Sequence, residues 1–518
     1  MTRNFFIIIF LAITLQVSAQ GYKIEVKINN LPNQELILGH HRSDRLVPDD
    51  TVVTNAQGYA VFSGKKELAQ GLYFIFLPSK TYFDFIIGDD QFFKIENDTT
   101  DFINNFKSKG SVENELFGKY QIFMTEQSQK MRQLQSQLKA EKDPAKKAEI
   151  ENQIKSISKE YDKKYEYVQT NYPSSFFALF LKAAKEVSIP DEITDNYKKY
   201  LYYKNHYFDN FDLSDARLLN TPFFDNKIQF YLDKLVPMVP DSINAACDEI
   251  LEKTKGDSTT YQYVLVYMFN KYAKSNLMIA ENIYSHLVDI YVKKAYWAPD
   301  SFKNEIKTKN VRKKQCLIGN KAKDLHMTML PDDTTAIEAL RIPLEEIKSR
   351  GLAIEKDTSR SFDDKLPDLS GLVSEYMAYF PNDIQLYSTN HKYTILWFMS
   401  PTCSHCIHDT PLFFDQLNKE LKDVDVVVWS IFLESSLDNW WKFCHEINEW
   451  YDFVEKHNLH SDKWINLWNP FDNYRFKYDI SASPVLYLLD KDKKIVAKKI
   501  GYEQAIEIIK EIESKGEE

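Results

Sequence analysis

The alternation of apolar and polar positions divides the chain into three zones. Near the N-terminus, residues 22–28 (YKIEVKI) alternate with a period of two, which is typical of a strand with one buried face. Further short apolar runs follow at residues 59–62, 71–77 and 82–87. Turn residues separate these runs, for example Asn55 to Gly58. Short strands at this spacing predict a small β-sandwich-like domain over residues 20–110.

In the middle of the chain, apolar positions recur every three to four residues, which predicts amphipathic helices. One stripe comprises Leu116, Tyr120, Phe123, Met131, Leu134 and Leu138, and a second comprises Ile150, Ile154, Ile157, Tyr161, Tyr165 and Val168. Asp143 and Pro144 lie between them as an N-cap followed by a first-turn proline. The two stripes therefore predict an antiparallel helical hairpin, packed within the chain in preference to serving as a partner-binding coiled coil. We expect an all-α domain over residues 111–312.

From residue 313 onward, apolar runs of strand length alternate with helical patterns. Residues 393–399 (YTILWFM) and 424–433 are predominantly apolar, as in fully buried strands, and residues 485–498 predict a closing hairpin. This alternation predicts an α/β domain over residues 313–518. The polar and charged stretch at about 333–385 is interpreted as an insertion before the main sheet.

The first 19 residues have the pattern of a secretory signal peptide. Arg3 supplies the positive charge, residues 5–15 form an apolar run, and residues 17–19 (VSA) form a small-residue cleavage site. The run is shorter than the roughly 20 apolar residues that span a bilayer, which disfavours an N-terminal anchor. No cysteine follows the cleavage site, so we expect a protein that is exported to a bacterial periplasm and is not lipidated.

The amino-acid composition excludes several classes of protein. The 518 residues include 75 acidic and 65 basic side chains, a formal net charge of −10, which gives no general affinity for nucleic acid. Hydrophobic residues make up 44% and charged residues 27%, which excludes a disordered chain. Five cysteines are too few for a disulfide scaffold at this length, but two of them form a CxxC motif.

The CxxC motif, Cys403-Ser-His-Cys406, directly follows the buried run 393–399 and is expected to open a helix. Two cysteines three residues apart in a first helical turn can close a small disulfide. The unpaired N–H groups and the dipole at a helix N-terminus stabilise a Cys403 thiolate. His405 could add positive charge or a hydrogen bond to that thiolate, and Cys406 would be shielded as the resolving thiol.

A zinc half-site is the competing interpretation of the motif, and it would need two more ligands. His405 and His408 lie nearby, but the sequence has no second CxxC. Adjacent His40 and His41 would point to opposite faces of a strand, so no metal is expected there either. A redox-active Cys403–Cys406 disulfide, with no metal or other cofactor, is therefore preferred.

Two further positions are candidate site residues. Asp409 lies one helical turn beyond Cys406 and could relay protons to it, or could be a solvated helix charge. Pro484 precedes the predicted strand at 485–489, which is consistent with a cis turn.

These features resemble the thioredoxin-like domain of the TlpA/ResA group of exported thiol-disulfide oxidoreductases. The matching segments are 395–398 (ILWF), 400–406 (SPTCSHC), Asp409, Pro411 and 483–485 (SPV), with 316–325 (CLIGNKAKDL) resembling the N-terminal segment of that group and of peroxiredoxins. The resemblance implies that Cys403 attacks, that Cys406 resolves, and that Pro484 is the cis-proline beside the disulfide. Asp409 stands where this family usually has Glu, and Trp397 stands where thioredoxin itself has a buried Asp.

The whole layout resembles a Bacteroidetes-type arrangement of a β domain and a helical domain, both of unknown function, before the thioredoxin-like domain. Residues 217–222 (RLLNTP) and 270–274 (NKYAK) resemble segments of that helical domain. The implied function is periplasmic thiol-disulfide exchange on protein substrates, with reduction or isomerisation favoured over oxidation. A reductase in this compartment would need an electron donor in the membrane.

Two alternative functions stay open. The β and helical domains could make this an envelope-binding or scaffold protein, with the thioredoxin-like domain as a redox-sensitive element. A thiol peroxidase would have Ser or Thr three residues before its reactive cysteine and Pro seven before. Ser400 meets the first condition, but Leu396 does not meet the second.

Overall fold

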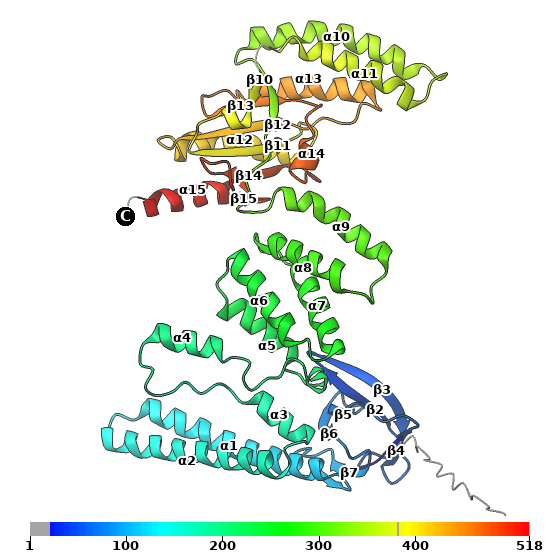
Figure 1. Ribbon diagram of the computed structural model, residues 1–518, viewed down its shortest axis with the longest axis vertical. Coiled ribbons are helices and arrows are strands. Elements are labelled where there is room, and N and C mark those ends of the chain that lie inside the picture. Colours follow the sequence, from blue (N-terminus) through cyan, green and yellow to red (C-terminus); the bar gives the residue numbers. More distant parts are fainter. Residues whose placement is uncertain (1–20, 381–382, 517–518) are drawn as a thin grey trace, which may run out of the picture. The chain divides into compact units, whose positions relative to one another are not determined.

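The computed structural model describes residues 21–380 and 383–516 (Figure 1). The predicted signal peptide, residues 1–19, lies outside the described residues. The chain forms two compact units, Met1–Tyr267 and Met268–Glu518. The first contains β-sheets followed by helices, and the second contains a mixed sheet with helices, so the predicted multidomain class with these three kinds of structure is confirmed.

Two four-stranded sheets open the first unit. One has the order β4-β1-β7-β8, with β1 at Tyr22–Asn29, β4 at Tyr59–Gly64, β7 at Phe92–Asp98 and β8 at Lys107–Lys109. The other has the order β3-β2-β5-β6, with β2 at Glu35–Arg42, β3 at Arg45–Val53, β5 at Gly71–Phe76 and β6 at Tyr82–Ile87. Alternate residues of β1, such as Ile24 and Val26, share one core with Leu38 and Phe85 of the other sheet. The period-two pattern therefore buries one face of each sheet against the other.

The predicted helical hairpin is present as α1 (Val112–Ala140) and α2 (Pro144–Asn171). Asp143 caps α2 by accepting a 2.8 Å hydrogen bond from the Ala145 N–H, with Pro144 in the first turn. The Asn114 side chain exchanges two 2.7 Å hydrogen bonds with the backbone of Ile86, which attaches α1 to β6. The elements that follow, as far as residue 273, are α3 (Phe176–Ala184), α4 (Asn196–Asn205), η1 (Ala216–Asn220), α5 (Phe224–Phe230), η2 (Tyr231–Leu235), α6 (Pro240–Lys253) and α7 (Ser258–Ala273).

A seven-stranded mixed sheet forms the centre of the second unit, in the order β10-β9-β13-β12-β11-β14-β15. Its strands are β9 (His326–Met329), β10 (Asp383–Gln385), β11 (Tyr393–Met399), β12 (Val426–Phe432), β13 (Trp464–Trp468), β14 (Val485–Leu489) and β15 (Ile495–Lys498). β11, β12 and β13 run parallel, whereas β14 and β15 form the predicted antiparallel hairpin. Every residue of β11 and β12 is buried, as their continuous apolar runs predict.

Helices pack against this sheet. They are α12 (Ser404–Glu420), α13 (Trp440–Lys456), α14 (Tyr474–Lys477) and α15 (Tyr502–Gly516). The stretch interpreted as an insertion forms α10 (Thr334–Lys356) and α11 (Phe362–Met377), which lie together with α13 (Figure 1). The Trp440 indole N–H of α13 donates to the Lys348 carbonyl of α10 at 3.1 Å. No helix within the described ranges is both long and apolar enough to cross a membrane.

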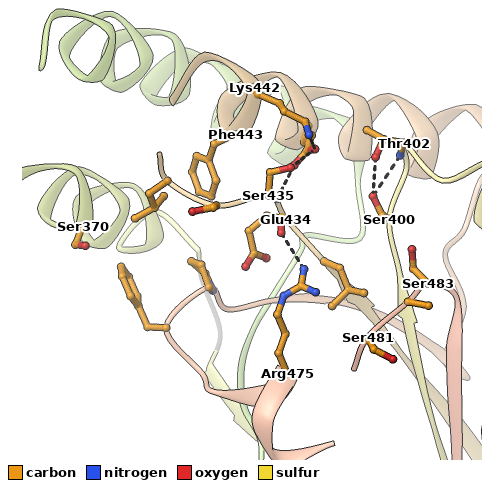
Figure 2. A pocket seen from close by; sticks show the side chains of 17 residues that line it. Ser370, Ser400, Thr402, Glu434, Ser435, Lys442, Phe443, Arg475, Ser481 and Ser483 are labelled. Carbon is orange, nitrogen blue, oxygen red and sulfur yellow. Dashed lines mark hydrogen bonds and ion pairs between the residues drawn. The ribbon is translucent and has the colours of Figure 1, made fainter. Parts of the chain in front are cut away.

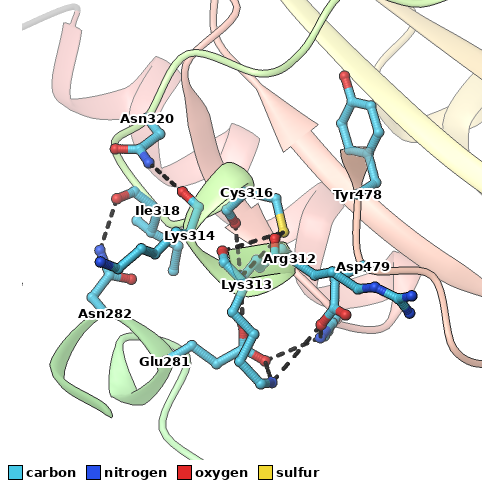
Figure 3. Close-up of polar contacts among 12 residues, drawn as sticks. Glu281, Asn282, Arg312, Lys313, Lys314, Cys316, Ile318, Asn320, Tyr478 and Asp479 are labelled. Carbon is cyan, nitrogen blue, oxygen red and sulfur yellow. Dashed lines mark hydrogen bonds and ion pairs between the residues drawn. The ribbon is translucent and has the colours of Figure 1, made fainter. Parts of the chain in front are cut away.

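A cluster of charges joins α8 (Ala280–Lys294) and α9 (Asp300–Gln315) to the edge of the sheet (Figure 3). The Lys498 ammonium of β15 is buried and donates to Glu281 Oε2 at 2.5 Å and to the Cys316 carbonyl at 2.7 Å. Burial opposes ionisation of Glu281, but Lys498, with Lys499 and Lys313, lowers its pKa to about 2. The Glu281 carboxylate is therefore ionised at neutral pH, and its ion pairs hold α8 and α9 against β15.

Candidate functional site

The CxxC motif lies where β11 ends and α12 begins. Alternate side chains of β11 enter two different cores, with Ile395 and Trp397 on one face of the sheet and Leu396 and Phe398 on the other. Each such burial stabilises the strand by about 1.5–3 kcal/mol, so the position of the turn that follows is firmly held. Cys403 is the N-cap residue of α12, as predicted.

The two thiols differ in exposure. Cys403 is partly exposed, whereas Cys406 is completely buried, and both are free thiols in this structure. The Cys403 thiol donates to the Ser483 carbonyl at 3.2 Å, and the Cys406 sulfur accepts from the Ser400 N–H at 3.4 Å. A reagent or substrate can therefore reach Cys403 but not Cys406.

The pKa values of the two thiols are shifted in opposite directions. Burial opposes ionisation of Cys403, but hydrogen bonds from the backbone N–H and the thiol of Cys406 and from Ser483 lower the pKa of the Cys403 thiol below its usual value. Burial raises the pKa of the Cys406 thiol to about 12. At neutral pH, thiolate character is therefore concentrated on the accessible sulfur.

The predicted cis-proline faces the accessible thiol. The Ser483–Pro484 peptide bond is cis, and β14, which follows it, pairs antiparallel with β11 through Phe398 and Val485. This pairing brings Ser483 and Pro484 beside the end of β11, where the Cys403 thiol bonds to the Ser483 carbonyl.

His405 and Asp409 do not contact the sulfurs in the way that the sequence suggested. His405 is exposed. The half-buried Asp409 carboxylate binds its neighbour His408 at 2.7 Å, and within the described residues it has no hydrogen bond to either thiol. Their roles in tuning and proton relay stay predictions.

The sequence reasoning missed a buried polar pair beneath the motif. The Trp397 indole N–H donates to the Thr410 hydroxyl at 3.0 Å, and both side chains are buried. An indole N–H in a buried strand needs a hydrogen-bond partner, and this requirement could have pointed to the pair from the sequence. The pair joins the strand before the CxxC to the helix after it.

Replacing Thr410 by Val should destabilise the second unit by about 1–3 kcal/mol, because the nearly isosteric side chain leaves the buried Trp397 N–H without an acceptor. All eight tryptophans lie in this unit, so urea unfolding followed by tryptophan fluorescence measures it selectively. Thr335→Val, at an exposed position of α10, is the matched control and should change stability by less than about 0.5 kcal/mol. Equal stability of the two variants would contradict the assigned role of the pair.

No group of three or more His, Cys, Asp or Glu side chains in the described part of the chain is placed to hold a metal ion. His40 binds Asp49 and His41 binds Asp84, each at 2.8 Å. The two histidines thus have separate carboxylate partners.

A pocket of about 720 Å³ opens beside the motif (Figure 2). On the side of the thiols it is lined by Ser400 and Thr402, which precede Cys403 in sequence, and by Ser481, Ala482 and Ser483 of the cis-proline turn. The loops after β12 and β13 and residues of α11, α13 and α14 line the rest. Sequence reasoning did not identify this pocket.

Two family models match parts of the chain. A domain of unknown function, DUF4369, matches residues 22–117, and a second, DUF5106, matches residues 125–311. No curated protein matches the chain.

Solved structures with similarity to the chain include thioredoxin-like proteins. A thioredoxin-like protein from Bacteroides caccae is 18% identical, with 62% of this chain and 96% of that chain covered and a TM-score of 0.39. A domain of a possible thiol-disulfide isomerase from Cytophaga hutchinsonii is 25% identical, with 39% and 96% covered and a TM-score of 0.25. A thiol:disulfide interchange protein from Bacteroides sp. is 16% identical, with 38% and 90% covered and a TM-score of 0.23. These scores are too low to establish a shared fold.

Proposed function

We propose that the chain is an exported, periplasmic thiol-disulfide oxidoreductase of the TlpA/ResA-like type, which acts through Cys403 and Cys406 of a thioredoxin-like C-terminal domain. One observation carries the proposal: two thiols one helical turn apart have opposite pKa shifts, and the accessible thiol is the more acidic. This asymmetry suits an attacking and a resolving thiol. Reduction or isomerisation is favoured over oxidation, following the TlpA/ResA resemblance.

In the proposed reaction, the Cys403 thiolate attacks one sulfur of a substrate disulfide. A bond forms between Cys403 and that sulfur, and the second substrate sulfur leaves as a thiolate that takes up a proton. Cys406 then loses its proton and attacks the Cys403 sulfur, which releases the first substrate sulfur as a thiol. Two electrons have passed to the substrate, and Cys403 and Cys406 form a disulfide. A dithiol electron donor, expected in the membrane, returns the pair to the reduced state.

The turn at Pro484 supports this assignment. Its Ser483 carbonyl lies 3.2 Å from the Cys403 sulfur, so a substrate that attacks or leaves there passes directly beside this backbone. The buried Cys406 meets the substrate only after Cys403 has reacted, which suits the order of the two steps.

Cys406→Ser should trap the mixed disulfide, because the resolving sulfur is then absent. A periplasmic extract incubated with this variant should show bands of higher mass that collapse on reduction, in a non-reducing gel probed for the chain. Cys444→Ala removes a buried thiol outside the motif and should show no such bands. Bands of equal intensity in both variants would count against Cys403 as the attacking thiol.

A further inference from the structure

The pocket beside Cys403 carries two cations on opposite sides (Figure 2). Lys442 projects from α13, and Arg475 projects from α14. Both side chains are exposed, and the Arg475 guanidinium donates a 3.0 Å hydrogen bond to the Glu434 carbonyl. This bond fixes the guanidinium at the pocket and uses one of its five N–H donors.

Few groups of the protein compete for these cations. In the part of the chain that the structure describes, no carboxylate forms an ion pair with Arg475. Lys442 lies 3.8 Å from Glu446 Oε1, but both Glu446 oxygens already accept 2.6 Å hydrogen bonds from the N–H and hydroxyl of Ser435. The ammonium and most of the guanidinium donors are therefore available to a ligand.

The other acidic residue of the pocket, Glu434, is buried and already has a hydrogen-bond partner. Glu434 Oε1 accepts a 2.8 Å hydrogen bond from the Tyr474 hydroxyl, and its buried Oε2 atom has no hydrogen-bond partner among the residues that the structure describes. Burial raises the pKa of the Glu434 carboxyl and shifts it toward the neutral form. Two cations therefore face one carboxylate that is already satisfied and one carboxyl that is shifted toward neutrality.

We propose that this pocket binds a carboxylate carried by the thiol or disulfide substrate, within a few residues of the cysteine that reacts with Cys403. This inference rests on the proposed function, since it gives the substrate class of the same site. Arg475 makes the main, bidentate contact, and Lys442 contributes a second positive charge from the opposite side. The hydroxyls of Ser436, Ser481 and Ser483 supply further polar contacts in the pocket.

The size and chemistry of the pocket suit this class of substrate. A volume of about 720 Å³ lies in the range of small-ligand pockets, so it can take an acidic side chain next to the reacting cysteine of a substrate. A guanidinium matches the two oxygens of a carboxylate, and such charge-assisted pairs are about twice as strong as neutral hydrogen bonds. Ser483 belongs to the pocket lining and also bonds to the Cys403 thiol, so a ligand in the pocket lies next to the reacting sulfur.

The test measures how fast Cys403 of the full-length Cys406→Ser chain opens peptide disulfides with a 2-thiopyridyl leaving group. Three eight-residue peptides with blocked ends carry Glu, Gln or Lys beside the cysteine, and release of the neutral thiopyridone gives the rate. This single exchange needs no electron donor and no natural client. The glutathionyl disulfide of the same leaving group tests a small peptide thiol with free carboxylates.

We expect the Glu peptide to react about tenfold faster than the Gln peptide, and the Lys peptide to react slowest. Arg475→Gln should remove most of the Glu preference. Lys442→Gln should lower the preference about threefold, because an ammonium makes no bidentate contact with a carboxylate. The quantity compared is the ratio of the Glu-peptide rate to the Gln-peptide rate within each variant. Lys456→Gln, at the exposed far end of α13, is the control and should keep the full preference.

The outcomes separate the two proposals. Equal rates with the three peptides together with a glutathionyl rate that Arg475→Gln leaves unchanged, or a Glu preference that survives Arg475→Gln, would overturn the carboxylate pocket and leave the thiol chemistry standing. A Cys403 that reacts with none of the disulfides would overturn the proposed function and the pocket together. If only the glutathionyl disulfide reacts more slowly after Arg475→Gln, the natural ligand is a small peptide thiol. If the rate of the eight-residue Glu peptide also falls after Arg475→Gln, a protein segment is the substrate.

Discussion

Serine in place of Cys403 should reduce insulin-disulfide reduction to the background rate of the added dithiol, a loss of at least about a thousandfold in the catalysed rate. A hydroxyl does not ionise in the accessible pH range and cannot form a disulfide, so the first bond of the proposed reaction is lost entirely. Turbidity from the released insulin B chain measures the rate. Because Cys403 is partly exposed, the substitution should leave folding nearly unchanged.

Two controls make this result specific. Cys444→Ala removes a buried thiol outside the motif and should keep the wild-type rate. Unchanged tryptophan fluorescence of the Cys403→Ser chain would show that the second unit is still folded. Insulin reduction that persists in the Cys403→Ser chain would remove the proposed mechanism.

Local pattern was sufficient to predict the framework of the site. Residues 393–399 are apolar at every position except Thr394, and this composition favours a strand buried on both faces over an exposed one. Cysteine at the helix N-cap and a proline before β14 are likewise local features, and both lie where the sequence placed them. The hairpin of α1 and α2 was predictable for the same reason, since its apolar stripes and the Asp143 cap are short-range.

Features that depend on distant residues were not predictable. The pocket brings together Thr402, Glu434, Lys442 and Arg475, which lie in different elements and acquire meaning only when the sheet places them side by side. Helical spacing made Asp409 either a proton relay to Cys406 or a solvated helix charge. In this structure its carboxylate bonds to the adjacent His408, a choice of rotamer that spacing does not determine. The strand order of the seven-stranded sheet also needed the structure, because pairing joins β9 to β13 across more than 130 residues.

A large difference in alkylation rate should separate the two thiols of the motif. The lowered pKa of Cys403 keeps its thiolate present to lower pH, so its rate with iodoacetamide should fall only as the pH drops through a value below 9. The Cys406 thiolate should appear only as the pH rises toward about 12. At pH 8, the fraction of thiolate therefore favours Cys403 by about a thousandfold or more.

The higher intrinsic nucleophilicity of the Cys406 thiolate offsets part of the advantage that Cys403 has in thiolate fraction. A thiolate of higher pKa attacks faster. With a Brønsted slope of about 0.4–0.5 over three or more pKa units, the rate constant of the Cys406 thiolate exceeds that of the Cys403 thiolate by a factor of about thirty. Cys403 should still react at least about thirtyfold faster, and the complete burial of Cys406 adds to the difference.

Peptide mass mapping after timed quenching measures both rates in one sample. In urea the two thiols should titrate alike near their common value of about 8.5, so the difference should vanish there. Equal rates in the folded chain, or faster labelling of Cys406, would contradict the division between attacking and resolving thiol.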